Sequence, residues 1–82
     1  PARYRVRYIP GETDSLWRIA GYPFVYNNNY LWMRLYNANK DLLYSPSDPH
    51  IILPGQILTI PSLKGEMREG LWDSKKTYPI YK

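Results

Sequence analysis

Apolar and polar side chains alternate along the first stretch of the chain. Residues 3–9 read RYRVRYI, so that Tyr4, Val6 and Tyr8 stand between arginines. A period of two is typical of a strand with one buried face. We therefore expect a strand here, with tyrosine and valine turned inward. The other face would be a solvated row of arginines: Arg3, Arg5 and Arg7.

The apolar spacing changes to that of a short helix after a turn at PGETDS. Leu16, Ile19 and Ala20 stand at i, i+3 and i+4, which places them on one helical face. Either Asp14 or Ser15 can cap the free amides at its start. A glycine and a proline follow closely, so this helix spans about two turns.

A second helical spacing covers YLWMRLYNANKD, in which Leu31 and Leu35 keep one apolar face. Asn28 or Asn29 can accept hydrogen bonds from the amides that open this helix. Near its end, we expect Asn39 to brace the following loop by hydrogen bonds to backbone groups.

A loop with two prolines follows, and LPGQILTIP then predicts a Pro-Gly turn and a second strand at 56–60. Strands at 4–8 and 56–60 would pair antiparallel, with both helices covering one face. The expected fold class is therefore α+β: a small βααβ domain with a two-stranded antiparallel sheet packed against two helices. Its shared core would contain Leu16, Ile19, Leu35 and Leu58.

The last stretch, residues 62–82, is predicted to be a C-terminal extension or linker to the domain at 1–61. Leu63, Met67, Leu71 and Trp72 can fold back onto that domain. Interspersed glycines and a proline argue against one continuous helix. We expect an ordered or partly ordered extension.

Composition limits the kind of protein that this can be. Eighty-two residues make one small domain that buries roughly 60–65% of its unfolded surface. With no cysteine, its stability depends on aromatic and aliphatic packing. A net charge of +4 tolerates anionic partners without requiring one. The chain begins Pro-Ala and shows no apolar run long enough for a membrane span, so we expect an excised domain of a larger parent.

The candidate chemistry does not favour catalysis. His50 is the single histidine, which argues against nucleophilic triads and histidine-based metal sites. Glu12 and Asp14 share one loop, whereas glycoside cleavage needs two carboxyls facing each other across a sugar. We therefore expect no enzyme, no catalytic residue, no metal and no cofactor. No basic helix or aromatic strand motif predicts nucleic-acid binding.

Three segments in order carry a family resemblance: DSLWRIA after a strand, LYNANKD at a helix end, and the closing LPGQILTIP. They resemble the lysin motif (LysM) family over residues 4–61. The resemblance implies a non-catalytic module that binds N-acetylglucosamine-containing glycans, chiefly bacterial peptidoglycan and in some lineages chitin. It also implies that the module anchors its parent to the cell wall, in a periplasmic, cell-envelope or extracellular location.

The resemblance further implies where the sugar binds: a shallow groove between residues 11–15 and residues 51–56. An acetamido sugar needs polar partners for its amide and hydroxyls and an apolar surface for its methyl and ring face. The implied ligand-binding residues are Gly11, Glu12, Thr13, Asp14, Ser15, Ile51, Ile52, Leu53 and Gly55. Here Gly11 lies two residues earlier than in the family, and Thr13 stands where glycine is expected.

Structural roles fit the same residues. Asp14 or Ser15 can be a helix cap, and Ile52 and Leu53 can be core. Trp17 is expected in the core or as a lid over the sheet. A second functional hypothesis is a protein-interaction module, in which this fold docks in an envelope, phage or spore assembly. The aromatic surface and the tail would then meet a protein.

Overall fold

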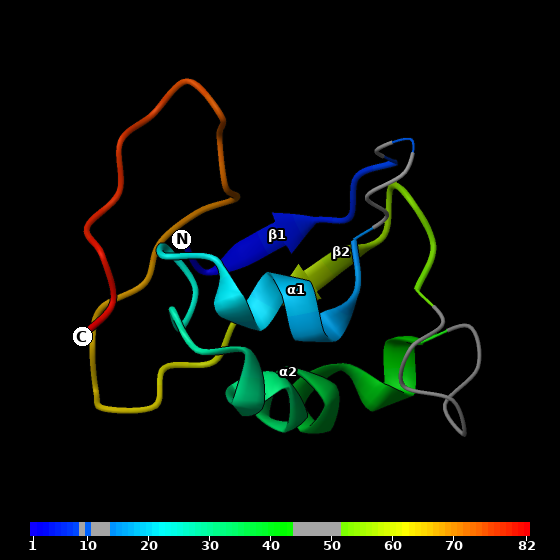
Figure 1. The fold of residues 1–82 in the computed structure, drawn as a ribbon, viewed down its shortest axis with the longest axis horizontal. Helices are drawn as coiled ribbons and strands as arrows, with labels where there is room; N and C mark the ends of the chain where they lie inside the picture. Colours follow the sequence, from blue (N-terminus) through cyan, green and yellow to red (C-terminus); the bar gives the residue numbers. More distant parts are fainter. Residues whose placement is uncertain (9, 11–13, 44–51) are drawn as a thin grey trace.

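The computed structural model describes residues 1–8, 10, 14–43 and 52–82. In this part of the chain a two-stranded sheet and two α-helices form a small α+β fold (Figure 1). Two short 3-10 helices flank the second α-helix. In chain order the elements are β1 (Arg3–Arg5), α1 (Leu16–Gly21), η1 (Asn29–Leu31), α2 (Trp32–Asn39), η2 (Lys40–Leu42) and β2 (Ile57–Thr59).

The two strands pair as predicted. β1 and β2 are antiparallel neighbours, with Tyr4 opposite Leu58 at the centre of the register. Both strands are shorter than the alternating pattern predicts. Tyr4 and Val6 are buried, but Tyr8 is 69% exposed, so the prediction that it points inward is wrong. The backbone leaves the ladder after Val6, because the amide of Arg7 donates to the carboxylate of Asp14.

Helix α1 is capped by Ser15, one of the two residues predicted as its cap. Ser15 has an extended backbone, and its hydroxyl accepts a hydrogen bond from the amide of Arg18 at 3.1 Å. Asp14 is not the cap, because its carboxylate is used inside the domain. Leu16 and Ile19 are fully buried, as their spacing predicts.

The approach to helix α2 is also capped by an asparagine. The side-chain oxygen of Asn28 accepts from the amide of Tyr30 at 3.0 Å and starts η1, one turn before α2. The side-chain amide of Asn29 instead donates to the carbonyl of Trp17. A β-carbon added at Gly21 would lie 2.3 Å from that amide, so the two helical segments approach closely because this residue is glycine.

Asn39 is fully buried and binds a strand rather than the loop that follows it. Its side-chain amide donates to the carbonyls of Leu35 and Thr59, both at 2.8 Å. Its side-chain oxygen accepts from the amide of Thr59 at 2.7 Å. The role predicted for Asn39, bracing the loop, is therefore corrected: it joins α2 to the outer edge of β2.

The core lies between the sheet and the helices. The four residues expected to share it are fully buried together: Leu16, Ile19, Leu35 and Leu58. Trp17 lies outside the core, 40% exposed, with its ring edge against Tyr30 at a centroid distance of 4.9 Å.

The tail, residues 62–82, returns to the N-terminal side of the domain, where the orange-to-red trace of Figure 1 forms a wide arc. Its Gly70 carbonyl accepts from the amides of Ala2 and Arg3, and the amide of Trp72 donates to the Arg3 carbonyl. Leu63 and Trp72 pack against the core. Met67 is exposed and does not. The tail therefore lies along the edge of β1 that faces away from β2.

Candidate functional site

The antiparallel pairing brings described residues from both predicted walls of the glycan groove to one end of the sheet. The chain leaves β1 and enters β2 at this end. The amide of Val6 donates to the Gln56 carbonyl at 2.8 Å, and the amide of Gly55 donates to the Val6 carbonyl at 2.7 Å. Gly55 has φ of +88°, a conformation that favours glycine. The turn at Gly55 is therefore anchored directly to the exit of β1.

Asp14, in the predicted wall before α1, is bonded to Arg7, the residue that follows Val6. The amide of Arg7 donates to one carboxylate oxygen of Asp14 at 2.8 Å. Residues 6 and 7 thus bind the segment before β2 on one side and the segment before α1 on the other. Described residues of both predicted walls therefore meet at the exit of β1.

Of the predicted binding residues that the structure describes, only some reach solvent. Leu53 is 45% exposed, and Gly55 is exposed beside it. Asp14 and Ile52 are buried, and the hydroxyl of Ser15 is occupied as the cap of α1. Four predicted residues lie outside the described part of the chain: Gly11, Glu12, Thr13 and Ile51.

The carboxylate of Asp14 is the centre of a buried polar cluster. Tyr4 donates its hydroxyl hydrogen bond to Asp14 at 2.7 Å, and Tyr22 donates a second. Burial, together with these bonds to Asp14, raises the pKa of Tyr4 and of Tyr22 above the ordinary tyrosine value. Both phenols therefore stay protonated donors at neutral pH, and the carboxylate serves the fold rather than a ligand.

Arg7 completes this cluster, which corrects its prediction as a solvated residue. Its Nε donates to the Tyr4 hydroxyl at 2.7 Å and lies 3.7 Å from the Asp14 carboxylate. Its guanidinium carbon lies 4.8 Å from the ring centre of Trp72, within the range of a cation–π contact. Arg3 and Arg5 are exposed, as predicted.

The segments that meet at this end of the sheet carry exposed apolar side chains. Tyr8 follows the exit of β1, Leu53 precedes the turn at Gly55, and Ile57, 41% exposed, begins β2. The Gln56 side chain donates to the carbonyl of Leu42 and so ties this turn to η2. Tyr8 and Ile57 were not among the predicted site residues. Tyr8 is exposed because β1 ends before it, and Ile57 is exposed because it alternates with the buried Leu58 in β2.

The described residues at this end of the sheet offer groups that can contact a ligand. They are apolar side chains and the backbone of the turn, whose amides at Gly55 and Gln56 already donate to the carbonyls of Val6 and Leu53. Across the described ranges, no group of three or more His, Cys, Asp or Glu side chains could hold a metal ion. No helix in those ranges is both long and apolar enough to cross a bilayer.

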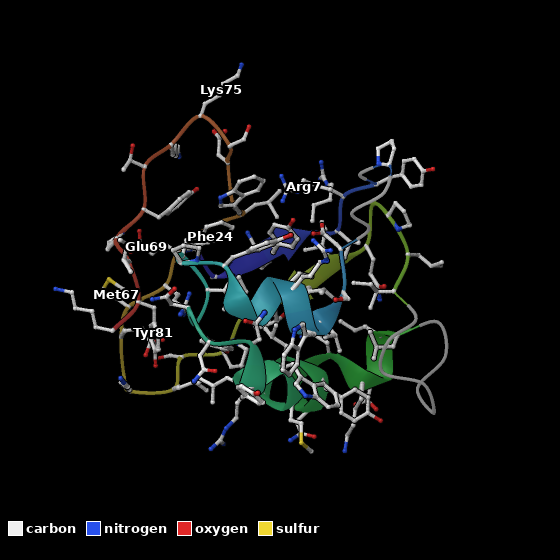
Figure 2. The ribbon with its side chains drawn as sticks, viewed as in Figure 1. Arg7, Phe24, Met67, Glu69, Lys75 and Tyr81 are labelled. Atoms are coloured by element: carbon white, nitrogen blue, oxygen red, sulfur yellow. The ribbon has the colours of Figure 1, made fainter. Side chains whose placement is uncertain are left out.

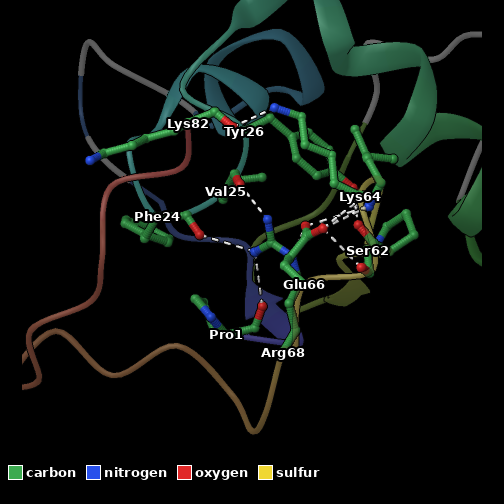
Figure 3. A network of polar contacts seen from close by, with 11 residues as sticks. Pro1, Phe24, Val25, Tyr26, Ser62, Lys64, Glu66, Arg68 and Lys82 are labelled. Atoms are coloured by element: carbon green, nitrogen blue, oxygen red, sulfur yellow. Dashed lines mark hydrogen bonds and ion pairs between the residues drawn. The ribbon is translucent and has the colours of Figure 1, made fainter.

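A second buried charge holds the tail, on the side of the molecule shown in Figure 3. The side chain of Arg68 is 7% exposed, and its guanidinium donates to the carbonyls of Pro1, Phe24 and Val25. Its Nε pairs with Glu66 at 3.0 Å. We call these contacts the Arg68 clamp. Sequence patterns did not reveal it, because three of its acceptors are backbone carbonyls distant in the sequence.

Comparison with known proteins finds a relative over nearly the whole chain. Treponemal membrane protein B of Treponema pallidum (strain Nichols) is 44% identical over 78 residues, which is 95% of this chain. The chain spans about a quarter of the length of that curated relative, because the match covers 24% of it. No family model and no solved structure matches the chain. The LysM resemblance therefore stays a prediction.

Proposed function

We propose that this chain is a LysM-like, non-catalytic module that binds N-acetylglucosamine-containing glycans, above all bacterial peptidoglycan, and anchors its parent to the cell wall. One observation supports the proposal most. Segments from opposite ends of the βααβ unit meet at Val6 and leave apolar side chains and turn backbone exposed together. This is the place where the family resemblance implies a sugar.

The exposed groups suit an acetamido sugar. Leu53, Tyr8 and Ile57 offer apolar surface for the ring face and the acetyl methyl group. The turn at Gly55 offers backbone groups without a side chain in the way. In this proposal Leu53 and Gly55 contact the ligand, whereas Asp14 and Ser15 hold the wall in place from behind.

The relative is named a membrane protein, and that name fits a parent located in the cell envelope. We place the module itself on the periplasmic or extracellular side, where peptidoglycan is accessible. A shallow site buries little area, so a single sugar should bind weakly and an oligomer more tightly. Attachment of the parent to the envelope would raise retention by effective concentration.

The test is a titration of the labelled full chain with chitin tetramer and with soluble peptidoglycan fragments, following amide chemical shifts. We expect saturable shifts at Leu53, Gly55 and Gln56, with dissociation constants on the order of 1 mM or below. Replacing the exposed Leu53 with serine should weaken binding by about fivefold or more, the effect of losing one apolar contact.

The matched control is Met67→Ser, which removes an exposed apolar side chain on the tail and should leave glycan binding unchanged. Absence of a saturable shift with either ligand at millimolar concentration would overturn the glycan proposal. Equal weakening by both substitutions would show nonspecific apolar adhesion instead.

The protein-interaction module remains a second candidate for a specific reason. Part of the β1 edge has no backbone partner among the described residues, and a basic groove lies beside it. This surface is separate from the proposed glycan contacts.

A further inference from the structure

The outer edge of β1 is occupied along only part of its length. At Arg3 the tail supplies both backbone partners: the Gly70 carbonyl accepts from the Arg3 amide at 3.0 Å, and the Trp72 amide donates to the Arg3 carbonyl at 2.8 Å. Arg3 and Leu71 form a parallel bridge. The tail thus begins a third strand but does not continue it.

Arg5 faces the same edge and is left without such partners. Successive residues of a strand direct their amide and carbonyl to opposite edges, so Arg5 repeats the direction of Arg3. Tyr4 and Val6 face β2 instead, as the bond from Val6 to Gln56 shows. No hydrogen bond links the Arg5 backbone to any described residue outside this sheet.

The tail leaves the edge because it forms a turn directly after Trp72. The Asp73 amide donates to the hydroxyl of Tyr78 at 2.8 Å, and the Lys76 amide donates to the Asp73 carbonyl at 3.0 Å. Figure 2 shows Lys75 at the outer tip of the resulting arc, pointing away from the domain, while Arg7 lies at the exit of β1. A groove opens between the arc and the free edge.

This edge groove has a volume of about 440 Å³ and a basic lining. Arg5, Arg7 and Lys76 line it against a single acid, Asp73. One oxygen of Asp73 already accepts from the amide of Lys75. The lining residues therefore carry a net charge of +2, while the buried carboxylate of Asp14 lies 3.7 Å from the Nε of Arg7.

The arginine beside the edge is held in place before any ligand arrives. The ring of Trp72 and the hydroxyl of Tyr4 fix the guanidinium of Arg7, whose side chain is still 41% exposed. Arg7 Nη1 has no hydrogen-bond partner in the described part of the chain. A fixed guanidinium with a free donor suits a carboxylate, since little side-chain entropy remains to be lost.

We infer that the edge groove binds an extended acidic segment of a partner protein, which adds as a strand beside Arg5. Its backbone continues the ladder that the tail begins, and its carboxylates meet Arg5, Arg7 and Lys76. This is recognition by strand addition, in which main-chain bonds provide affinity and side-chain contacts provide selectivity.

The free backbone pair favours a peptide over a glycan or a simple anion. The Arg5 amide and carbonyl require an acceptor and a donor at the spacing of a peptide chain. The arginines also repel basic strands, as charged residues commonly do at sheet edges. The inference does not depend on the glycan proposal, because the edge groove includes neither Leu53 nor Gly55.

The experiment uses the full chain and a blocked seven-residue peptide that alternates Glu with Val. We expect saturable amide shifts at Arg5, Trp72 and Ser74, with a dissociation constant of about 0.1–1 mM. The matched peptide that alternates Lys with Val should bind at least about tenfold more weakly. N-methylation of the central peptide bonds should produce a similar loss, because it removes ladder donors.

Two exposed arginines of the same strand make a matched pair of variants. R5E should weaken the acidic peptide at least about tenfold, whereas R3E should change it by no more than about twofold. Neither side chain has a described partner, so both variants should keep the fold, which circular dichroism checks.

Four results would overturn the inference. Equal weakening of peptide binding in R5E and R3E would show general charge attraction. Unchanged binding of the N-methylated peptide would show that main-chain hydrogen bonds do not hold the peptide. Equal occupation of the groove by inorganic pyrophosphate would assign it to anions. The absence of any saturable shift at millimolar peptide concentration would show that the edge groove does not bind an acidic strand.

Discussion

Two buried charges stabilise different parts of this small domain, and each is satisfied in a different way. Asp14 accepts hydrogen bonds mainly from side chains, those of Tyr4 and Tyr22, with the Arg7 amide as a third donor. Arg68 donates mainly to backbone carbonyls, those of residues 1, 24 and 25. A buried charge is costly unless its hydrogen bonds are made, and here both sets are made.

The difference separates two kinds of dependence on sequence. The Asp14 cluster requires particular residues at its partner positions, because only a phenol supplies both the donor and the packed ring. The Arg68 clamp requires a particular backbone path, because any residue provides a carbonyl. The Asp14 cluster anchors the segment before α1, at the end of the sheet where we propose that glycans bind. The Arg68 clamp anchors the tail that borders the edge groove.

The largest expected effect tests the Asp14 cluster. Asp14→Ala leaves two phenols and the Arg7 amide without their acceptor, and the Arg7 guanidinium without its ion-pair partner. We expect it to lower the free energy of unfolding by about 3–5 kcal/mol, because each buried donor left without an acceptor costs about 1–3 kcal/mol. Urea denaturation monitored by tryptophan fluorescence measures it.

Asp41→Ala is the matched control, since Asp41 is exposed on η2 and should change the free energy by less than about 0.5 kcal/mol. If Asp14→Ala lowered the free energy of unfolding by less than about 1 kcal/mol, this carboxylate would not be what holds the segment before α1 to the exit of β1.

A smaller effect is expected from the clamp, and it should be local. Arg68→Lys keeps the charge but loses the planar fork that reaches several carbonyls, so we expect a loss of about 1–3 kcal/mol. Amide hydrogen exchange should accelerate at Trp72 and Tyr81, whose amides bind Arg3 and Pro23, more than at Leu58 in the sheet. Equal acceleration at all three would show that tail and sheet unfold as one unit.

Arg18→Lys is the control for the clamp, because Arg18 is exposed on α1. It should leave both the free energy of unfolding and the exchange rates close to those of the unmodified chain.

The smallest effect concerns the acid that pairs with the clamp. Although burial opposes ionisation, hydrogen bonds from the Lys64 amide, the Ser62 hydroxyl and Arg68 lower the pKa of Glu66 to about 2. The pKa of Glu66 is lower in the folded chain than in the unfolded chain, where it is about 4.3. Ionised Glu66 therefore stabilises the fold at pH values above that unfolded pKa. This stabilisation should therefore disappear as the pH falls from about 4.5 toward 2.

Glu66→Gln should cost less than about 1 kcal/mol at pH 7, because the pair is partly solvated. Its unfolding free energy should also change less with pH across that acidic range. The control is Glu69→Gln, which alters an exposed acid labelled on the tail in Figure 2 and should leave the pH dependence unchanged. Identical pH profiles for Glu66→Gln and the unmodified chain would contradict the lowered pKa.

Local patterns predicted the elements of the fold and their order. The cap at Ser15, the cap at Asn28 and the apolar face of α1 each depend on residues within four positions of one another. Pairing of the terminal strands followed because two strands that bracket two helices have few other partners. Of the proposed glycan contacts, sequence reasoning identified Leu53 and Gly55 but not Tyr8 or Ile57.

Contacts between distant residues were decided by the tertiary structure alone. Alternation assigned Arg7 wholly to solvent, yet its guanidinium contacts Trp72 from the tail and Asp14 from the next loop. Asn39 was expected to bind the loop beside it but binds Thr59 in β2. The sequence by itself determined the periodic faces and the helix caps, because these depend on neighbours along the chain. Only the folded path determined which backbone groups and rings surround each buried charge, because that depends on where the chain returns.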